Sequence, residues 1–152
     1  MIAAALAAAA GCGKGDERAR PGEGAASPPR DPLLDVALPA GATRVDGNQF
    51  HVDVVAQPGC TAGTTCAVLA DVTSLGDFKV NPEYPHKFVP AAGSTPAPAA
   101  TFTLTGVHRA RLIVRLPRPS DAPLRVAGDL KLSVCNPDRC LIEVAPIAVA
   151  ID

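Results

Sequence analysis

Cysteine is the residue type in this sequence with the widest capacity for chemistry. The chain of 152 residues contains five cysteines. A cysteine sulfur can carry a lipid, form a stabilising disulfide, bind zinc or exchange disulfides with another thiol. The residues around each cysteine indicate which of these is expected. The five are Cys12, Cys60, Cys66, Cys135 and Cys140.

Cys12 ends an uninterrupted apolar run of small residues. Residues 1–11 are about half as long as a membrane-spanning helix, so they predict a signal peptide. The segment Ala9-Ala10-Gly11-Cys12 resembles a lipobox, where small residues precede the cysteine that receives diacylglycerol. Ala9 stands where Leu is usual, and no Lys or Arg precedes the run, which indicates a start codon further upstream. We predict lipidation at Cys12; the alternatives are an uncleaved hydrophobic tail and a miscalled start.

The other four cysteines form an even set, which in an exported protein indicates disulfides. Three pairings are possible. Local pairing of Cys60 with Cys66 and of Cys135 with Cys140 is favoured, because each pair brackets a turn. A loop this short gains only about 2 kcal/mol from closure, so stability is a weak reason for either bond. We interpret Cys60 and Cys66 as a structural disulfide.

Cys135 and Cys140 flank an Asn-Pro-Asp turn between two expected strands. A disulfide across a hairpin must fit fixed strand spacing, so it tends to be more easily reduced, as an electron-transfer site requires. Arg139 would favour a thiolate at Cys140, and Asp138 would oppose it.

The expected register of this hairpin raises a conflict. If these two cysteines sat directly opposite each other, the polar Lys131 and Ser133 would share a face with apolar residues of the next strand. Those residues, Ile142 and Val144, fit a buried pattern. The sequence therefore predicts a bulge, or a position of Cys140 in the turn.

Other chemistries have less support. Neither cysteine pair has the spacing usual for zinc, and we expect no metal and no other cofactor. His51, His86 and His108 are isolated in the sequence and are expected to be strand or loop residues. No haem-attachment motif, nucleophile elbow or carboxylate pair supports hydrolase or haem chemistry.

Composition limits the partners. Lys plus Arg number 14 and Asp plus Glu 15, and aromatic residues make up 3%. There is thus no basic field and no stacking platform for nucleic acid. The length predicts one ordinary domain, placed at residues 33–152. Residues 12–32 are rich in Gly, Pro, Ala, Ser and charge, which predicts a flexible tether behind the lipidated cysteine.

Apolar residues alternate with polar ones in about seven short stretches, the pattern of strands with one buried face. Residues suited to turns separate them, including Ala127-Gly128-Asp129, and no stretch has a helical period. We predict an all-β fold, an immunoglobulin-like antiparallel sandwich. The stretches centre on residues 50–54, 68–72, 102–104, 110–116, 130–134, 142–144 and 147–151.

Two segments carry a family resemblance. Residues 78–88 (FKVNPEYPHKF), followed by residues 128–135 (GDLKLSVC) and Cys140-Leu141, resemble the amino-terminal domain of the DsbD family of thiol:disulfide interchange proteins. The resemblance covers residues 50–152. It implies an immunoglobulin-like sandwich with a redox-active cysteine pair, Cys135 and Cys140, in which Cys140 forms mixed disulfides with partners. Family members shield the pair with an aromatic cap, for which Phe78 and Tyr84 are the candidates here.

Two hypotheses follow. The first is a lipid-anchored domain in the bacterial envelope that faces the periplasm and exchanges disulfides with other envelope thiol proteins through Cys135 and Cys140. The mature chain would have no transmembrane helix and would need its electron donors in trans. The second is a non-catalytic envelope lipoprotein whose sandwich binds or assembles with partners, both disulfides being structural.

Overall fold

The computed structural model describes residues 29–92 and 98–151. Cys12, the predicted signal peptide and most of the predicted tether lie outside the described residues. No helix in the described ranges is long and apolar enough to cross a membrane.

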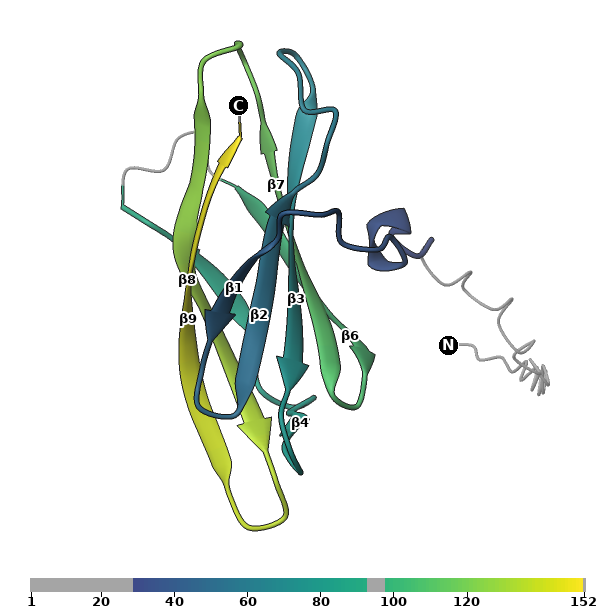
Figure 1. The fold of residues 1–152 in the computed structure, drawn as a ribbon, viewed down its shortest axis with the longest axis vertical. Coiled ribbons are helices and arrows are strands. Elements are labelled where there is room, and N and C mark those ends of the chain that lie inside the picture. Colours follow the sequence, from purple (N-terminus) through teal and green to yellow (C-terminus); the bar gives the residue numbers. More distant parts are fainter. Residues whose placement is uncertain (1–28, 93–97, 152) are drawn as a thin grey trace, which may run out of the picture.

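The described chain is a sandwich of two antiparallel sheets (Figure 1), which confirms the predicted fold class. Sheet A has the order β1-β2-β3-β7-β6. In sheet B the long β8 pairs with β9 on one edge, and with β4 and β5 in succession on the other. The strands are β1 (Thr43–Asp46), β2 (Phe50–Ala56), β3 (Thr65–Ser74), β4 (Lys79–Val80), β5 (Lys87–Pro90), β6 (Ala99–Gly106), β7 (Arg109–Pro117), β8 (Leu124–Cys135) and β9 (Cys140–Ile151).

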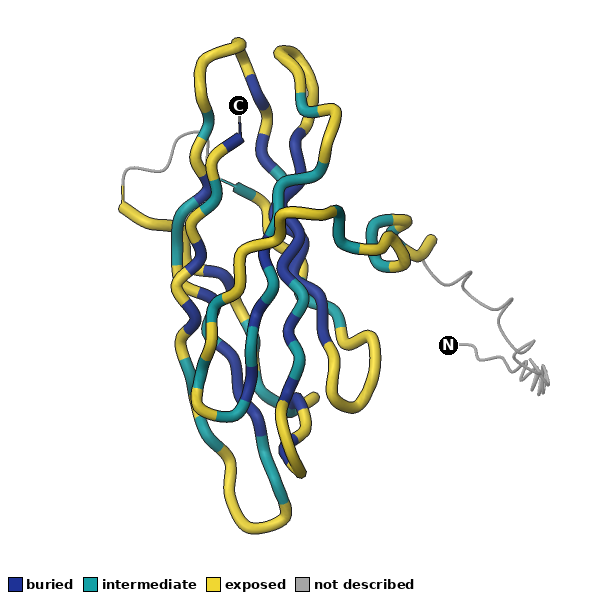
Figure 2. Tube along the Cα trace, viewed as in Figure 1, coloured by how far each residue is buried: buried dark blue, intermediate teal, exposed yellow. Residues whose placement is uncertain are grey.

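Side-chain alternation builds the core between the sheets. Branched and aromatic residues at every second position of the central strands point inward, where they stabilise the fold by leaving water. Figure 2 shows the buried stretches on the central strands and the exposed turns at both ends. The fully buried side chains in this core include Phe50, Val52, Val68, Val72, Leu112, Val114, Leu130, Leu132 and Val134.

The structure has nine strands in its described part, against the seven or so predicted. The sequence stretches 142–144 and 147–151 form one strand, β9, and the short β1, β4 and β5 were missed. The predicted turn at Ala127-Gly128-Asp129 is wrong, because Gly128 lies inside β8. Gly128 allows β5 to pack closely against β8, because an added Cβ would lie 2.6 Å from the Phe88 ring and 2.4 Å from the Val89 carbonyl oxygen.

A short segment before β1 lies on the outer face of sheet A. It begins with a 3-10 helix, η1 (Pro32–Leu34), capped by the Asp31 carboxylate, which accepts from the Leu33 amide. Arg111 on β7 holds this segment: one guanidinium nitrogen donates to the carbonyls of Leu33, Leu34 and Val36. Leu69 and Ile113 lie opposite each other on the same face as Asp71 and Arg111, and both are fully buried.

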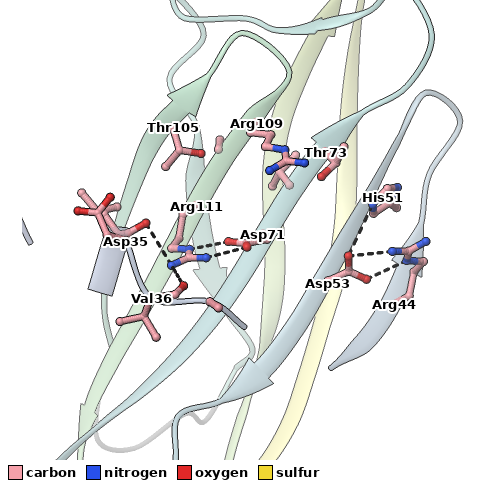
Figure 3. Close-up of a pocket in the computed structure, with 14 residues that line it drawn as sticks. Asp35, Val36, Arg44, His51, Asp53, Asp71, Thr73, Thr105, Arg109 and Arg111 are labelled. Atoms are coloured by element: carbon pink, nitrogen blue, oxygen red, sulfur yellow. Dashed lines mark hydrogen bonds and ion pairs between the residues drawn. The ribbon is translucent and has the colours of Figure 1, made fainter. Parts of the chain in front are cut away.

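The Arg111 guanidinium is itself fixed by Asp71, with which it forms two hydrogen bonds of 2.5 and 2.7 Å (Figure 3). This bidentate pairing raises the pKa of Arg111. Asp31, which the sequence places in the tether, contacts the sandwich, because its carboxylate accepts a hydrogen bond from Arg115 on β7 at 2.6 Å.

Candidate functional site

Cys135 and Cys140 form a disulfide at the base of the β8–β9 turn. The Asn136 amide donates to the Arg139 carbonyl at 2.9 Å inside the turn. Since hydrogen-bonded and non-hydrogen-bonded pairs alternate along an antiparallel ladder, the cysteines occupy a non-hydrogen-bonded pair. Their Cα–Cα distance of 4.0 Å agrees with the closer approach of such pairs.

The predicted bulge is absent. The β8–β9 register runs without a break from Leu124 opposite Ile151 to Cys135 opposite Cys140. Ile142 and Val144 therefore share the outer face of sheet B with the disulfide, and they are 71% and 50% exposed instead of buried. The prediction failed because the inner face of this part of β9 is formed by Leu141 and Glu143.

The two sulfurs differ in surroundings. Cys140 is exposed and lies on β9, which pairs with no other strand on its second edge within the described residues. Cys135 is half-buried on β8, with Cys140 on one side and Lys79 of β4 opposite it on the other. A thiol from solvent thus has a more open approach to Cys140.

Asn136 organises the turn between the cysteines. Its side-chain oxygen accepts hydrogen bonds from the amides of Asp138 and Arg139, at 3.2 and 2.9 Å. Its side-chain nitrogen donates to an Asp77 carboxylate oxygen at 3.2 Å, which ties the turn to the β3–β4 loop. The sequence marked this residue as part of a turn; its second role was not visible because Asp77 is 59 residues away.

Ser133 was not predicted as a site residue. Its side chain is buried on the outer face of sheet B, and its hydroxyl lies 3.9 Å from the Cys135 sulfur. A hydroxyl at this position can donate a hydrogen bond to a Cys135 thiolate once the disulfide is reduced. The spacing of two residues along one strand is the only sequence signal for it.

A shallow pocket of about 300 Å³ adjoins the disulfide. Cys135, Asn136 and Pro137 line one side of it, and Asp77 with residues 79–82 around β4 lines the other. Neither cap candidate shields Cys140, which is exposed: the Phe78 side chain is buried in the core, and the Tyr84 ring packs edge-on against His86.

The second disulfide joins Cys60 to Cys66, as predicted, at the opposite end of the sandwich. Cys66 is 2% exposed and belongs to the core, and Cys60 packs against that core. The buried Arg118 guanidinium donates to the Cys60 carbonyl at 2.9 Å and also to the carbonyls of Ser120 and Asp121. This arginine therefore joins the two loops at that end.

The three histidines lie apart from the cysteines in their contacts. His51 approaches Asp53 at 3.6 Å, and His108 Nδ1 lies 2.8 Å from the Phe78 carbonyl. His86 stacks on Phe102 and donates from Nε2 to the Asn81 carbonyl at 2.6 Å, while its Nδ1 is buried without a partner. Burial lowers the pKa of His86. In the described ranges, no three His, Cys, Asp or Glu side chains are grouped to hold a metal.

A larger pocket lies elsewhere, on the outer face of sheet A beside residues 34–37 (Figure 3). Two ion pairs dominate its lining. Arg44 forms a bidentate pair with Asp53, whose pKa is lowered by those hydrogen bonds, and Arg111 pairs with Asp71. These charges satisfy each other, so the pocket presents a polar surface and no convergent catalytic group.

Comparisons with protein-family models, curated proteins and solved structures find no match for this chain. The resemblance of residues 78–88, 128–135 and 140–141 to the DsbD family therefore stays a prediction, and the geometry of the cysteine site is the basis for proposing a function.

Proposed function

We propose that this protein exchanges disulfides with thiol proteins of the bacterial envelope through Cys135 and Cys140, and that a lipid on Cys12 anchors it at the membrane facing the periplasm. The observation that carries the proposal is the contrast between the two sulfurs. Cys140 is exposed on an edge strand, and Cys135 is half-buried between two strands. An incoming thiolate thus has one accessible target, and the other sulfur is placed to leave.

The exchange needs two steps. A partner thiolate attacks Cys140 Sγ; a bond forms between these sulfurs as the Cys135–Cys140 bond breaks, and the electron pair leaves on Cys135 Sγ, which takes a proton from solvent. A second partner thiolate then attacks the partner sulfur of the mixed disulfide and releases Cys140. The partner is oxidised to a disulfide, and this protein holds two electrons and two protons. The reverse sequence passes electrons to a partner.

Measuring the reduction potential of each cysteine pair tests the proposal. The oxidised protein is equilibrated in thiol buffers of defined potential, alkylated, and analysed by mass spectrometry of the peptides. We expect Cys135–Cys140 to fall among the oxidoreductases, roughly −120 to −270 mV. Cys60–Cys66 serves as the internal control and should lie below about −300 mV.

A potential below about −300 mV for both pairs would overturn redox activity and leave the non-catalytic lipoprotein as the better hypothesis. The lipid anchor is tested separately, by labelling cells with a radioactive fatty acid. Incorporation into the full chain that is lost in Cys12→Ser supports the anchor, and equal labelling of both contradicts it.

A further inference from the structure

We propose that the free edge of β9 beside Cys140 binds an extended segment of the partner as an added strand, and that this segment carries the reacting cysteine among acidic residues. This inference rests on the proposed function and specifies the kind of partner that the site accepts.

The hydrogen-bonding pattern of β9 supports strand addition. Because the cysteines form a non-hydrogen-bonded pair, Cys140, Ile142 and Val144 all direct their backbone N–H and C=O groups away from β8. No strand of the described chain pairs with this edge. Unpaired groups on an edge are a template for an extended peptide.

Pro146 sets the length of this template. It follows the same alternation, so its missing N–H falls on the free edge and costs no bond to β8. At Pro146 the edge therefore lacks one donor. The uninterrupted stretch nearest the disulfide runs from Cys140 to Ala145, with the exposed cysteine at its start.

The geometry of sulfur displacement favours an attacker on this side. In thiol–disulfide exchange the entering sulfur approaches the attacked sulfur from the side opposite the leaving one. Cys135 lies on β8, so the entering sulfur must reach Cys140 from the free edge of β9. A strand added there places a side chain opposite Cys140 at about 4.5–5.5 Å between Cβ atoms, close to disulfide spacing.

Charge and apolar contacts indicate the composition of the segment. Ile142 and Val144 offer exposed apolar surface next to Cys140. Lys131 lies beside Val144 and opposite Lys87, a like-charge pair that is unfavourable without an anion nearby. None of Lys79, Lys87 and Lys131 is in an ion pair within the described residues. The acidic Asp129 is on the same face of β8 but lies two residues further from the disulfide than Lys131. Side chains at every second position of an added strand share one face, so a segment that carries both apolar and acidic residues on the same face as its cysteine fits this surface.

Two eight-residue peptides with one central cysteine test the inference, one built of Val and Glu and the other with Lys in place of Glu. The rate of mixed-disulfide formation with the oxidised protein is followed by acid quenching and mass spectrometry at low salt. Each rate is divided by the same variant's rate with 2-mercaptoethanol, which has no backbone to pair. We expect the acidic peptide to react about tenfold faster than the basic one, with the advantage lost in high salt.

Three variants separate the backbone from the charges. Ile142→Pro removes an outward N–H and should lower the normalised acidic-peptide rate about tenfold. Ala148→Pro makes the same change beyond Pro146 and should react as wild type. Lys131→Glu leaves the backbone intact and should reverse the peptide preference.

An Ile142→Pro rate equal to wild type, or equal rates for the two peptides, would overturn strand addition while the redox function stands. If 2-mercaptoethanol itself reduces Cys135–Cys140 only when the protein unfolds, the proposed function fails, and this inference fails with it.

Discussion

The two disulfides close loops of nearly equal length at opposite ends of one sandwich, but they meet different surroundings. At one end, Cys66 belongs to the core, Cys60 packs against it, and the buried Arg118 donates to the Cys60 carbonyl. Cys135–Cys140 lies on the outer face of sheet B, with one sulfur open to solvent on an edge strand. The position of each disulfide relative to the sheets, and not the length of its loop, therefore decides how exposed its sulfurs are.

The largest expected difference between the two bonds is in their rates of reduction. A thiol can attack the exposed Cys140 directly, but Cys66 is buried and Cys60 is half-buried against the core, so we expect attack on that bond to require local opening of the core end. If that opening costs about 4 kcal/mol, dithiothreitol should reduce Cys135–Cys140 about a thousandfold faster than Cys60–Cys66. Timed alkylation and peptide mass spectrometry measure both rates in one sample. Equal reduction rates for the two disulfides would contradict the expected difference in their accessibility.

Removing the arginine at the core end should destabilise the protein substantially. Arg118→Met removes the charged donor to carbonyl groups of two loops, so we expect the free energy of unfolding to fall by about 2 kcal/mol. Urea unfolding followed by circular dichroism measures it. Arg125→Met, at an exposed arginine, is the matched control and should change stability little. A loss no larger than that of the control would contradict the role given to Arg118.

A smaller effect is expected at the exposed end. Asn136→Ala removes the acceptor of two turn amides and the link to Asp77, all partly open to water, and should cost about 1 kcal/mol. It should also speed reduction of Cys135–Cys140, because the turn that holds the cysteines together loosens. Ser120→Ala, which removes one exposed side-chain hydrogen bond, to the Ala122 amide, in a loop away from the disulfide, is the control. An unchanged reduction rate in Asn136→Ala would show that the turn is held by other contacts.

The smallest expected effect depends on pH. Burial lowers the pKa of His86, so the folded protein binds a proton there less readily than the unfolded chain. The stability that neutral His86 contributes is present above its unfolded pKa of about 6.5, and it is lost as pH falls from there through the folded pKa. We expect the free energy of unfolding to decline between pH 7 and 5 in wild type and to decline less in His86→Gln. Parallel curves would contradict this.

The sequence predicted the sandwich and both disulfides because alternation and cysteine spacing are local signals. It assigned Ile142 and Val144 to the core because apolar residues at alternate positions imply a buried face. Only the register, set by the turn around Asn136, reveals that this face points outward. Ile142 and Val144 do share one face of β9, as the alternation predicts, but that face is the exposed outer face of sheet B.

Long-range contacts account for the rest of what the sequence missed. Strands β4 and β5 have two and four residues, too few for an alternation to be recognised. Arg111 and Arg118 look like ordinary surface charges, yet both are buried because they bind backbone carbonyls far away in the chain. No local rule pairs Arg111 with residues 33–36, about 75 positions earlier.

The hydrogen bonds from Arg111 to residues 33–36 determine the side of the domain from which the amino-terminal segment leaves. The chain leaves the body from the flank of sheet A, and Cys140 lies on the outer flank of sheet B. The Arg111 contacts therefore fix where the amino-terminal segment leaves the described domain, on the side away from Cys140. A bulky group attached to that segment would leave the approach to Cys140 open.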